Sequence, residues 1–178
     1  MIKSVKIALL TATLVFSSFV SDNPAYRVFD SKGKGSSYSK MLNEASEADI
    51  VFIGELHNNS IAHWIELEVT GDLFETRGSD LVLGAEMFER DDQLAINEYF
   101  SGAYATDKFE PEVKLWKNYK TDYKPLLEFA REHNLGFIAT NIPRRYASMV
   151  SKEALKPLTL ADDAKRYIAP FLHLMILN

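Results

Sequence analysis

Residues 49–57 have the sequence DIVFIGELH, a short apolar run with an acidic residue before it and a glycine after it. Such a run is typical of a strand that is buried on both faces of a parallel sheet. Glu55 and His57 follow directly beyond the carboxyl end of this predicted strand. Because open α/β sheets bind ligands outside the carboxyl ends of their strands, these two side chains are candidate site residues.

A second stretch repeats this arrangement. Residues 80–89, DLVLGAEMFE, again contain an apolar run, a glycine and then a glutamate, Glu86. Two strands of this kind are expected to bring Glu55 and Glu86 to one edge of the sheet. A third strand is predicted at residues 135–140, and it ends just before Asn141. Helical segments alternate with these strands, so the predicted fold class is α/β, a mainly parallel sheet with flanking helices.

The predicted helices lie between and after the strands. One covers Tyr38 to Ala48, and Asn58 or Asn59 caps the next, whose apolar positions continue to Phe74. The remaining helices are expected from Asp91 to Phe100, from about Leu126 to His133, from Arg145 to about Lys152 and from Leu160 to Tyr167. Residues 101–122 are predicted to be irregular and rich in aromatic side chains.

The first part of the chain is expected to be separate from the single domain that follows. Residues 1–21 contain two lysines before an apolar run that is too short to span a bilayer comfortably, which is the pattern of a secretory signal. An uncleaved anchor or a buried helix is the alternative. Residues 22–37 are polar and are predicted to form a tether, with one short strand at residues 26–29.

Composition excludes several classes of function. The chain has 20 basic and 25 acidic residues, a net charge of −5 and no evident basic patch, so nucleic acid is not an expected partner. It has no cysteine, which excludes disulfides, thiolate metal sites, a cysteine nucleophile and lipid attachment through a lipobox cysteine.

Several polar side chains are expected just after the strands or in the first turns of the helices that follow. These are Glu55, His57, His63, Glu86, Asn141, Arg144 and Arg145. An imidazole with a carboxylate can bind a divalent metal and activate water, or act as a general acid–base pair. Either arginine could pair with a carboxylate of a substrate or cofactor.

Structural interpretations remain open for the same residues. His57 could be a loop residue that hydrogen-bonds to a backbone carbonyl, and His63 could lie on the solvent face of its helix. Glu86 could form an ion pair with an arginine. The aromatic residues between Tyr104 and Tyr123 are a second candidate site, because a tyrosinate can ligate ferric haem and flat rings can pack a porphyrin. Ordinary core packing is the alternative for them.

Four motifs together resemble one known family. They are FIGELH (residues 52–57), GAEMFE (84–89), YKPLLEFAR (123–131) and ATNIPR (139–144). In this order they are similar to the ChaN-like haem-binding lipoproteins of the Tiki/erythromycin-esterase-like superfamily, and the resemblance covers about residues 38–170. It implies an α/β fold and an exported, membrane-associated protein of haem and iron acquisition. It also implies haem at a dimer interface, with a tyrosine on the iron and a histidine assisting.

The resemblance also suggests roles for particular residues. The positions that match the polar signature of the superfamily are Glu55, His57, Glu86, Asn141 and Arg144. Tyr123 is the first candidate for the tyrosine on the haem iron and Tyr119 the second. His57, His63, Asn141 and Arg144 are the other expected haem-binding residues. An exported haem-binding protein, periplasmic or associated with the outer membrane, is therefore expected, with a homodimer and the outer-membrane uptake machinery as possible partners.

Two departures from the family lead to further expectations. The lipobox cysteine is missing, so lipid anchoring by that route is not expected. Family members are also longer, and residues 171–178 no longer resemble the family, so a C-terminally truncated member with an incomplete domain is expected. Two alternatives to haem binding stay open. One is a hydrolase that uses Glu55, His57 and Glu86, with a divalent metal possible, and the other is an inactive fragment.

Overall fold

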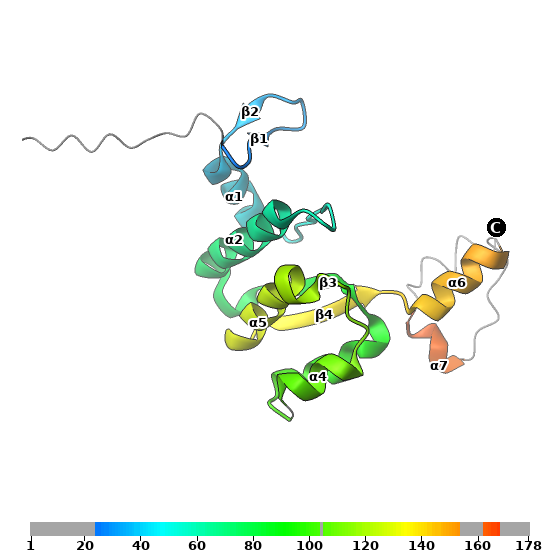
Figure 1. The fold of residues 1–178 in the computed structure, drawn as a ribbon. Coiled ribbons are helices and arrows are strands. Elements are labelled where there is room, and N and C mark those ends of the chain that lie inside the picture. The colour runs from blue at the N-terminus through cyan, green and yellow to red at the C-terminus, as the bar shows by residue number, and fades with distance from the viewer. Residues whose placement is uncertain (1–23, 104, 154–161, 168–178) are drawn as a thin grey trace, which may run out of the picture.

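The computed structural model describes residues 24–103, 105–153 and 162–167 (Figure 1). Its strands are β1 (Val28–Phe29), β2 (Gly35–Ser36), β3 (Val82–Glu89) and β4 (Gly136–Asn141). Its α-helices are α1 (Tyr38–Glu47), α2 (Ser60–Arg77), α3 (Gln93–Phe100), α4 (Thr106–Glu112), α5 (Lys124–Glu132), α6 (Arg144–Glu153) and α7 (Asp162–Lys165). Short 3₁₀ turns cover Gly78–Asp80 and Arg90–Asp92, and one π-helical turn covers Tyr119–Tyr123.

The central sheet of the described chain consists of β3 and β4. The two strands run parallel, with Val82 opposite Gly136 and Ala85 opposite Ala139. The register shifts between Ala85 and Glu89, and Glu89 then lies opposite Asn141. Parallel pairing with helices α3, α4 and α5 between the strands confirms the predicted α/β class.

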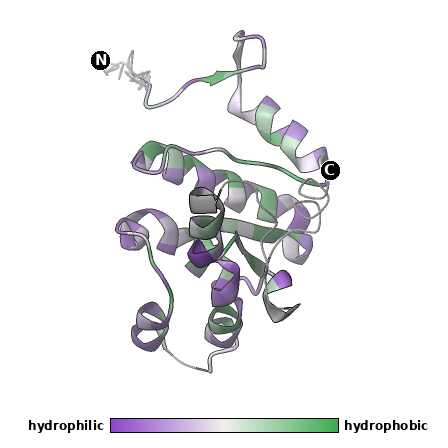
Figure 2. Ribbon diagram, turned by 90° about the vertical axis from the view of Figure 1, so that its right-hand side faces the viewer, coloured by the Kyte–Doolittle hydropathy of each residue, from purple (hydrophilic) through white to green (hydrophobic). Residues whose placement is uncertain are grey.

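Among the described residues, one face of this sheet is covered and the other is exposed. Phe137 and Ala139 are buried, whereas Ile138, which points to the opposite face, is exposed. Helices α3 and α5 pack on the covered face. Leu127 of α5 and Phe88 of β3 are fully enclosed there, and each such side chain contributes roughly 1.5–3 kcal/mol of burial energy. Figure 2 shows hydrophobic segments gathered in these central strands.

The first predicted strand is not formed. Residues 50–53 are coil that leads toward α2, and their side chains face solvent, with Phe52 92% and Ile50 71% exposed. The prediction was wrong because an apolar run gives only a preference for a strand, while pairing and burial require a neighbouring element. Within the described residues no strand pairs with this segment, so the expected three-stranded sheet has two strands.

Other elements differ from expectation in smaller ways. Residues 106–112, expected to be irregular, form α4. The expected tether contains a hairpin in which β1 pairs antiparallel with β2. The proposed signal at residues 1–21 and the tail at residues 171–178 lie outside the described residues. In the part of the chain that is described, no helix combines the length and apolar character that a membrane span needs.

Candidate functional site

The start of α2 fixes the position of two site residues. Asn59 caps the helix, because its side-chain oxygen accepts hydrogen bonds from the amides of Ile61 and Ala62 at 3.0 and 3.1 Å. His63 and Glu66 follow three residues apart, which places them on one helix face. That face is directed toward the coil that carries Glu55, and His63 is buried there.

Glu55 joins the coil to the rest of the cluster. Its Oε1 accepts a hydrogen bond from the Tyr123 hydroxyl at 2.9 Å and lies 2.7 Å from His57 Nδ1. Its Oε2 lies 3.0 Å from His63 Nδ1. Only 9% of the Glu55 side chain is exposed. The carboxylate therefore contacts two histidines and a tyrosine from three separate segments of the chain.

His63 is almost fully enclosed, with 3% of its side chain exposed. Its Nδ1 also lies 3.3 Å from Glu66 Oε2. On the other side of the ring, Nε2 lies 3.3 Å from the carbonyl oxygen of His57 and 3.7 Å from Asp122 Oδ2. Because a carbonyl can only accept, the Nε2 atom carries a hydrogen in this arrangement.

The π-helical turn at residues 119–123 contributes the remaining residues of the Glu55 cluster. It carries Asp122 and Tyr123, and the side-chain amide of Asn118 just before it donates to the His57 carbonyl and to Asp122 Oδ2, both at 2.7 Å. π-turns within helices are frequent at functional sites. Here the turn ties the His57 segment to the N-terminal end of α5.

The carboxylates of this cluster affect the pKa values around them. Burial, followed by the charge of Glu55 and a hydrogen bond with it, raises the pKa of Glu66 to about 7, while His63 acts in the opposite direction. Burial and the bond to Glu55 also raise the pKa of the Tyr123 hydroxyl. Glu66 thus exchanges a proton near neutral pH, whereas Tyr123 is held in its protonated form.

His57 forms the accessible side of the cluster. Its side chain is 52% exposed, and its ring meets the Trp116 ring edge-on with 5.0 Å between the centroids. Leu56 beside it is also largely exposed. An imidazole with a free edge and apolar neighbours can therefore contact a ligand without rearrangement of the chain.

The structure does not bring Glu86 to this cluster. Glu86 lies within β3, is exposed, and makes no hydrogen bond or ion pair with the described residues. The expected meeting of Glu55 and Glu86 at one sheet edge was wrong, because residues 50–53 are not a strand beside β3. Helix α2 and the π-turn hold Glu55 instead.

Asn141 and Arg144 belong to a second polar region, at the carboxyl ends of β3 and β4. Glu89 Oε2 accepts from Lys114 Nζ at 2.8 Å and from the backbone amide of Arg144 at 2.9 Å. Asn141 ends β4 opposite Glu89, and Arg145 pairs with Asp91. These contacts are structural, and none of them reaches the Glu55 cluster within the described chain.

Tyr119, the second candidate for a haem ligand, is a core residue. It is buried against Phe88, and its hydroxyl finds no hydrogen-bond partner among the described residues. Burial and the nearby carboxylates raise the pKa of this hydroxyl. Its position fits packing better than ligand binding.

Sequence reasoning missed Glu66, Asp122 and Asn118, whereas Trp116 lies in the aromatic stretch that was considered as a second candidate site. A local signal existed only for Glu66, which lies three residues after His63 on a predicted helix. Asp122 and Asn118 reach the cluster from about sixty residues along the chain, and no spacing rule indicates that contact.

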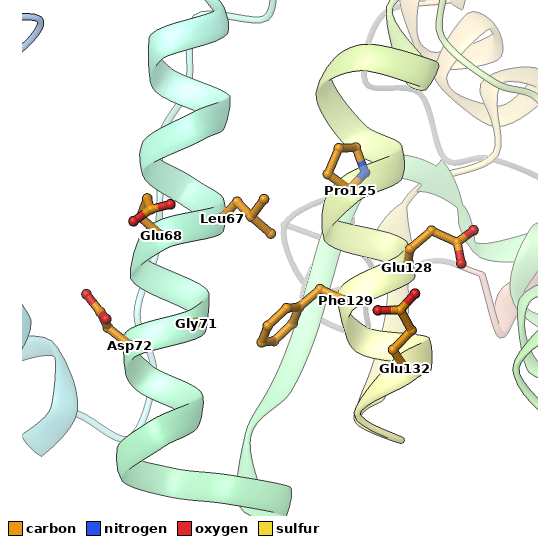
Figure 3. A pocket seen from close by; sticks show the side chains of 8 residues that line it. All are labelled: Leu67, Glu68, Gly71, Asp72, Pro125, Glu128, Phe129 and Glu132. Carbon is orange, nitrogen blue, oxygen red and sulfur yellow. The ribbon is translucent and has the colours of Figure 1, made fainter.

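A shallow groove of about 340 Å³ lies elsewhere, between α2 and α5 (Figure 3). Leu67 and Phe129 point into it from the two helices. Its other lining side chains include four carboxylates, those of Glu68, Asp72, Glu128 and Glu132. A ligand that carries carboxylates would be repelled there, and no residue of the Glu55 cluster lines the groove.

The fold and the cluster define an α/β protein with a buried carboxylate–imidazole site. Residues 41–175 match the family model described as haem-binding uptake, Tiki superfamily, ChaN. The chain therefore belongs to this family, as its four motifs predicted. The match extends past Pro170, where the resemblance was expected to end.

A solved structure of ChaN from Campylobacter jejuni, described as showing cofacial haem binding, is similar to the chain. The TM-score is 0.54 at 16% sequence identity, with 81% of this chain and 60% of that one covered. At this identity the likeness shows a shared fold. No curated protein matches the chain.

Proposed function

We propose that this chain binds haem and serves haem uptake, with the porphyrin seated on the surface around His57. The observation that carries the proposal is the half-exposed imidazole of His57, which follows the exposed Leu56 in the chain and packs against the Trp116 ring. Imidazole is a common axial ligand of haem iron, and apolar side chains suit the porphyrin face. Lys117, next to Trp116 and exposed, could pair with a haem propionate.

The tyrosines fit haem less directly than His57. Tyr123 remains the proposed ligand by family resemblance, and it lies beside the cluster, but its hydroxyl is buried and donates to Glu55. Ligation by Tyr123 therefore requires Glu55 to release the phenol and the phenol to lose its proton. The coil that carries Glu55 has few buried side chains, which favours such a movement.

A haemin titration followed by visible absorption tests both parts of the proposal. We expect a saturable Soret shift that His57→Ala weakens by about tenfold, the equivalent of about 1.4 kcal/mol. His133→Ala, which removes an exposed histidine at the end of α5, is the matched control. A spectrum that stays that of free haemin while the protein melts cooperatively would contradict haem binding.

The identity of the iron ligand is tested in the same titration. Tyr123→Phe is expected to abolish a tyrosinate-type spectrum, whereas Tyr26→Phe, in the N-terminal segment, should leave it unchanged. An unaltered spectrum in Tyr123→Phe would exclude Tyr123 and leave His57 as the ligand.

The expected cellular setting remains part of the proposal. We infer export to the periplasm or the outer membrane, contact with the outer-membrane uptake machinery, and a homodimer that forms around haem. The exposed apolar residues near His57 support the dimer, because a second copy could cover them. Sedimentation with and without haemin would show whether a dimer forms, and a constant monomer mass would contradict it.

A hydrolase is the second candidate, and one observation favours it. Glu55 Oε1 lies 2.7 Å from His57 Nδ1. A carboxylate in this position can orient the imidazole so that it acts as a general base. Glu86 takes no part in this pair. Turnover of a simple aryl ester by the unaltered chain that is lost in Glu55→Gln would support this function. Absence of turnover by the unaltered chain would contradict it.

A further inference from the structure

Glu55 Oε2 is a buried oxygen without a hydrogen-bond donor among the described residues. His63 Nδ1 lies only 3.0 Å from it, and Glu66 Oε2 lies 3.3 Å from the same nitrogen. A buried carboxylate oxygen that nothing satisfies is costly, so its surroundings need an explanation.

The tautomer of His63 makes the need for a cation explicit. Its Nε2 is directed at the His57 carbonyl, 3.3 Å away, and so carries the hydrogen. Nδ1 faces the oxygens of Glu55 and Glu66, which also accept unless one of these carboxylates is protonated. This contact is therefore held together either by a proton, on Nδ1 or on Glu66, or by a metal ion that takes the place of that proton.

The charge around His63 favours a metal ion over a proton. Carboxylates of Glu55, Glu66 and Asp122 all approach this one imidazole. Within the described chain their ion-pair partners are histidines, and no lysine or arginine lies within 4.0 Å of them. One added proton offsets a single negative charge, whereas a divalent cation offsets two.

We propose that Glu55, His63 and Glu66 bind a divalent first-row transition-metal ion, of which Zn²⁺ is the best fit. Their ligand atoms all lie within 4.8 Å of one another. Two carboxylates and an imidazole form a three-ligand set that leaves a fourth position for water. The imidazole favours Zn²⁺ over Mg²⁺ and Ca²⁺, which prefer oxygen donors alone.

The surrounding contacts suit the same assignment. His63 Nε2 is oriented by a backbone carbonyl, as is usual for a histidine ligand of a metal. Glu55 keeps Oε1 for the Tyr123 hydroxyl, which leaves Oε2 free for the ion. This site lies behind His57 and does not rest on haem binding.

Titration of the full chain with Zn²⁺ after removal of metal with EDTA tests the site. We expect one ion per chain, and Glu66→Gln is expected to weaken binding at least about tenfold. Glu68→Gln, which neutralises an exposed carboxylate two residues further along α2, is the matched control and should bind as the unaltered chain does. Mg²⁺ in excess should not displace Zn²⁺.

Thermal unfolding curves measured with and without Zn²⁺ show whether each variant is folded and whether it binds the ion. Zn²⁺ should raise the melting temperature of the unaltered chain and of Glu68→Gln, and leave that of Glu66→Gln nearly unchanged. Equal Zn²⁺ affinity in Glu66→Gln and the unaltered chain would overturn the proposal. Absence of saturable Zn²⁺ binding by the unaltered chain would overturn it as well, whatever the haemin titration shows.

Discussion

Glu55 makes different contacts with its two carboxylate oxygens, and this division organises the cluster. One oxygen holds Tyr123 and His57, and the other faces His63 without a hydrogen bond. A neutral amide at this position would replace one of the two oxygens by a donor, and so remove either the acceptor for Tyr123 or the oxygen proposed to bind the metal ion. Both carboxylate oxygens are therefore needed for the proposed metal site.

The pair formed by Glu66 and Glu55 should make stability depend on pH. The ordinary pKa of Glu66 is 4.5, and the fold raises it to about 7. The folded chain thus holds more protons than the unfolded chain between these values, so stability falls as pH rises from about 4.5 to about 7. The loss is expected to be on the order of 1 kcal/mol, because partial hydration weakens the effect.

Urea unfolding of the EDTA-treated chain at pH 5 and pH 8 measures this effect. Glu66→Gln removes the titration, and it should be more stable relative to the unaltered chain at pH 8 than at pH 5. Glu68→Gln should show no such shift, since that carboxylate is exposed. A difference between Glu66→Gln and the unaltered chain that is independent of pH would contradict the argument.

At the scale of elements, the cap of α2 controls the geometry of the site. The Asn59 side chain satisfies two amides of the first turn, from which His63 projects. Asn59→Ala should destabilise the chain by about 1 kcal/mol in thermal unfolding. It should also weaken Zn²⁺ binding, because His63 is then less well positioned. Asn58→Ala, one residue earlier, serves as control, and an equal effect of both variants would contradict the role of the cap.

Sequence patterns predicted well those elements that local rules determine. The cap at Asn59 and the helix expected from about Leu126 to His133, which is α5, both appear where the sequence indicated them. Strands β3 and β4 were also predicted, although each extends further, so that Glu86 and Asn141 lie inside them. Ends of strands depend on the partner strand, which no local pattern specifies.

The site was predicted in part, for a similar physical reason. Glu55, His57 and Tyr123 were expected as site residues, and the structure brings them together. His63 was left open between a structural and a functional role, and it lies at the centre of the cluster. The prediction for Glu86 was wrong because it depended on a strand at residues 50–53. Whether such a strand forms depends on the whole sheet, since a strand needs a partner.

At the scale of the whole molecule, apolar side chains are exposed on several segments of the described chain. They include the coil at residues 50–53 and the face of the sheet that carries Val82 and Ile138. Exposed apolar side chains add nothing to folding stability but promote association. Covering such surface is therefore expected to change solubility and assembly more than the melting temperature.

Phe52→Lys tests this separation directly. Phe52 is 92% exposed, so the change should alter the free energy of unfolding by less than about 0.5 kcal/mol. It should reduce light scattering of concentrated protein and binding of a hydrophobic dye, because it replaces the aromatic side chain of the exposed coil by a charged one. Phe88→Lys, at a buried position of β3, is the contrasting variant and should prevent cooperative unfolding. If Phe52→Lys instead prevented cooperative unfolding, the Phe52 side chain would have to contribute to folding stability, which would contradict this separation.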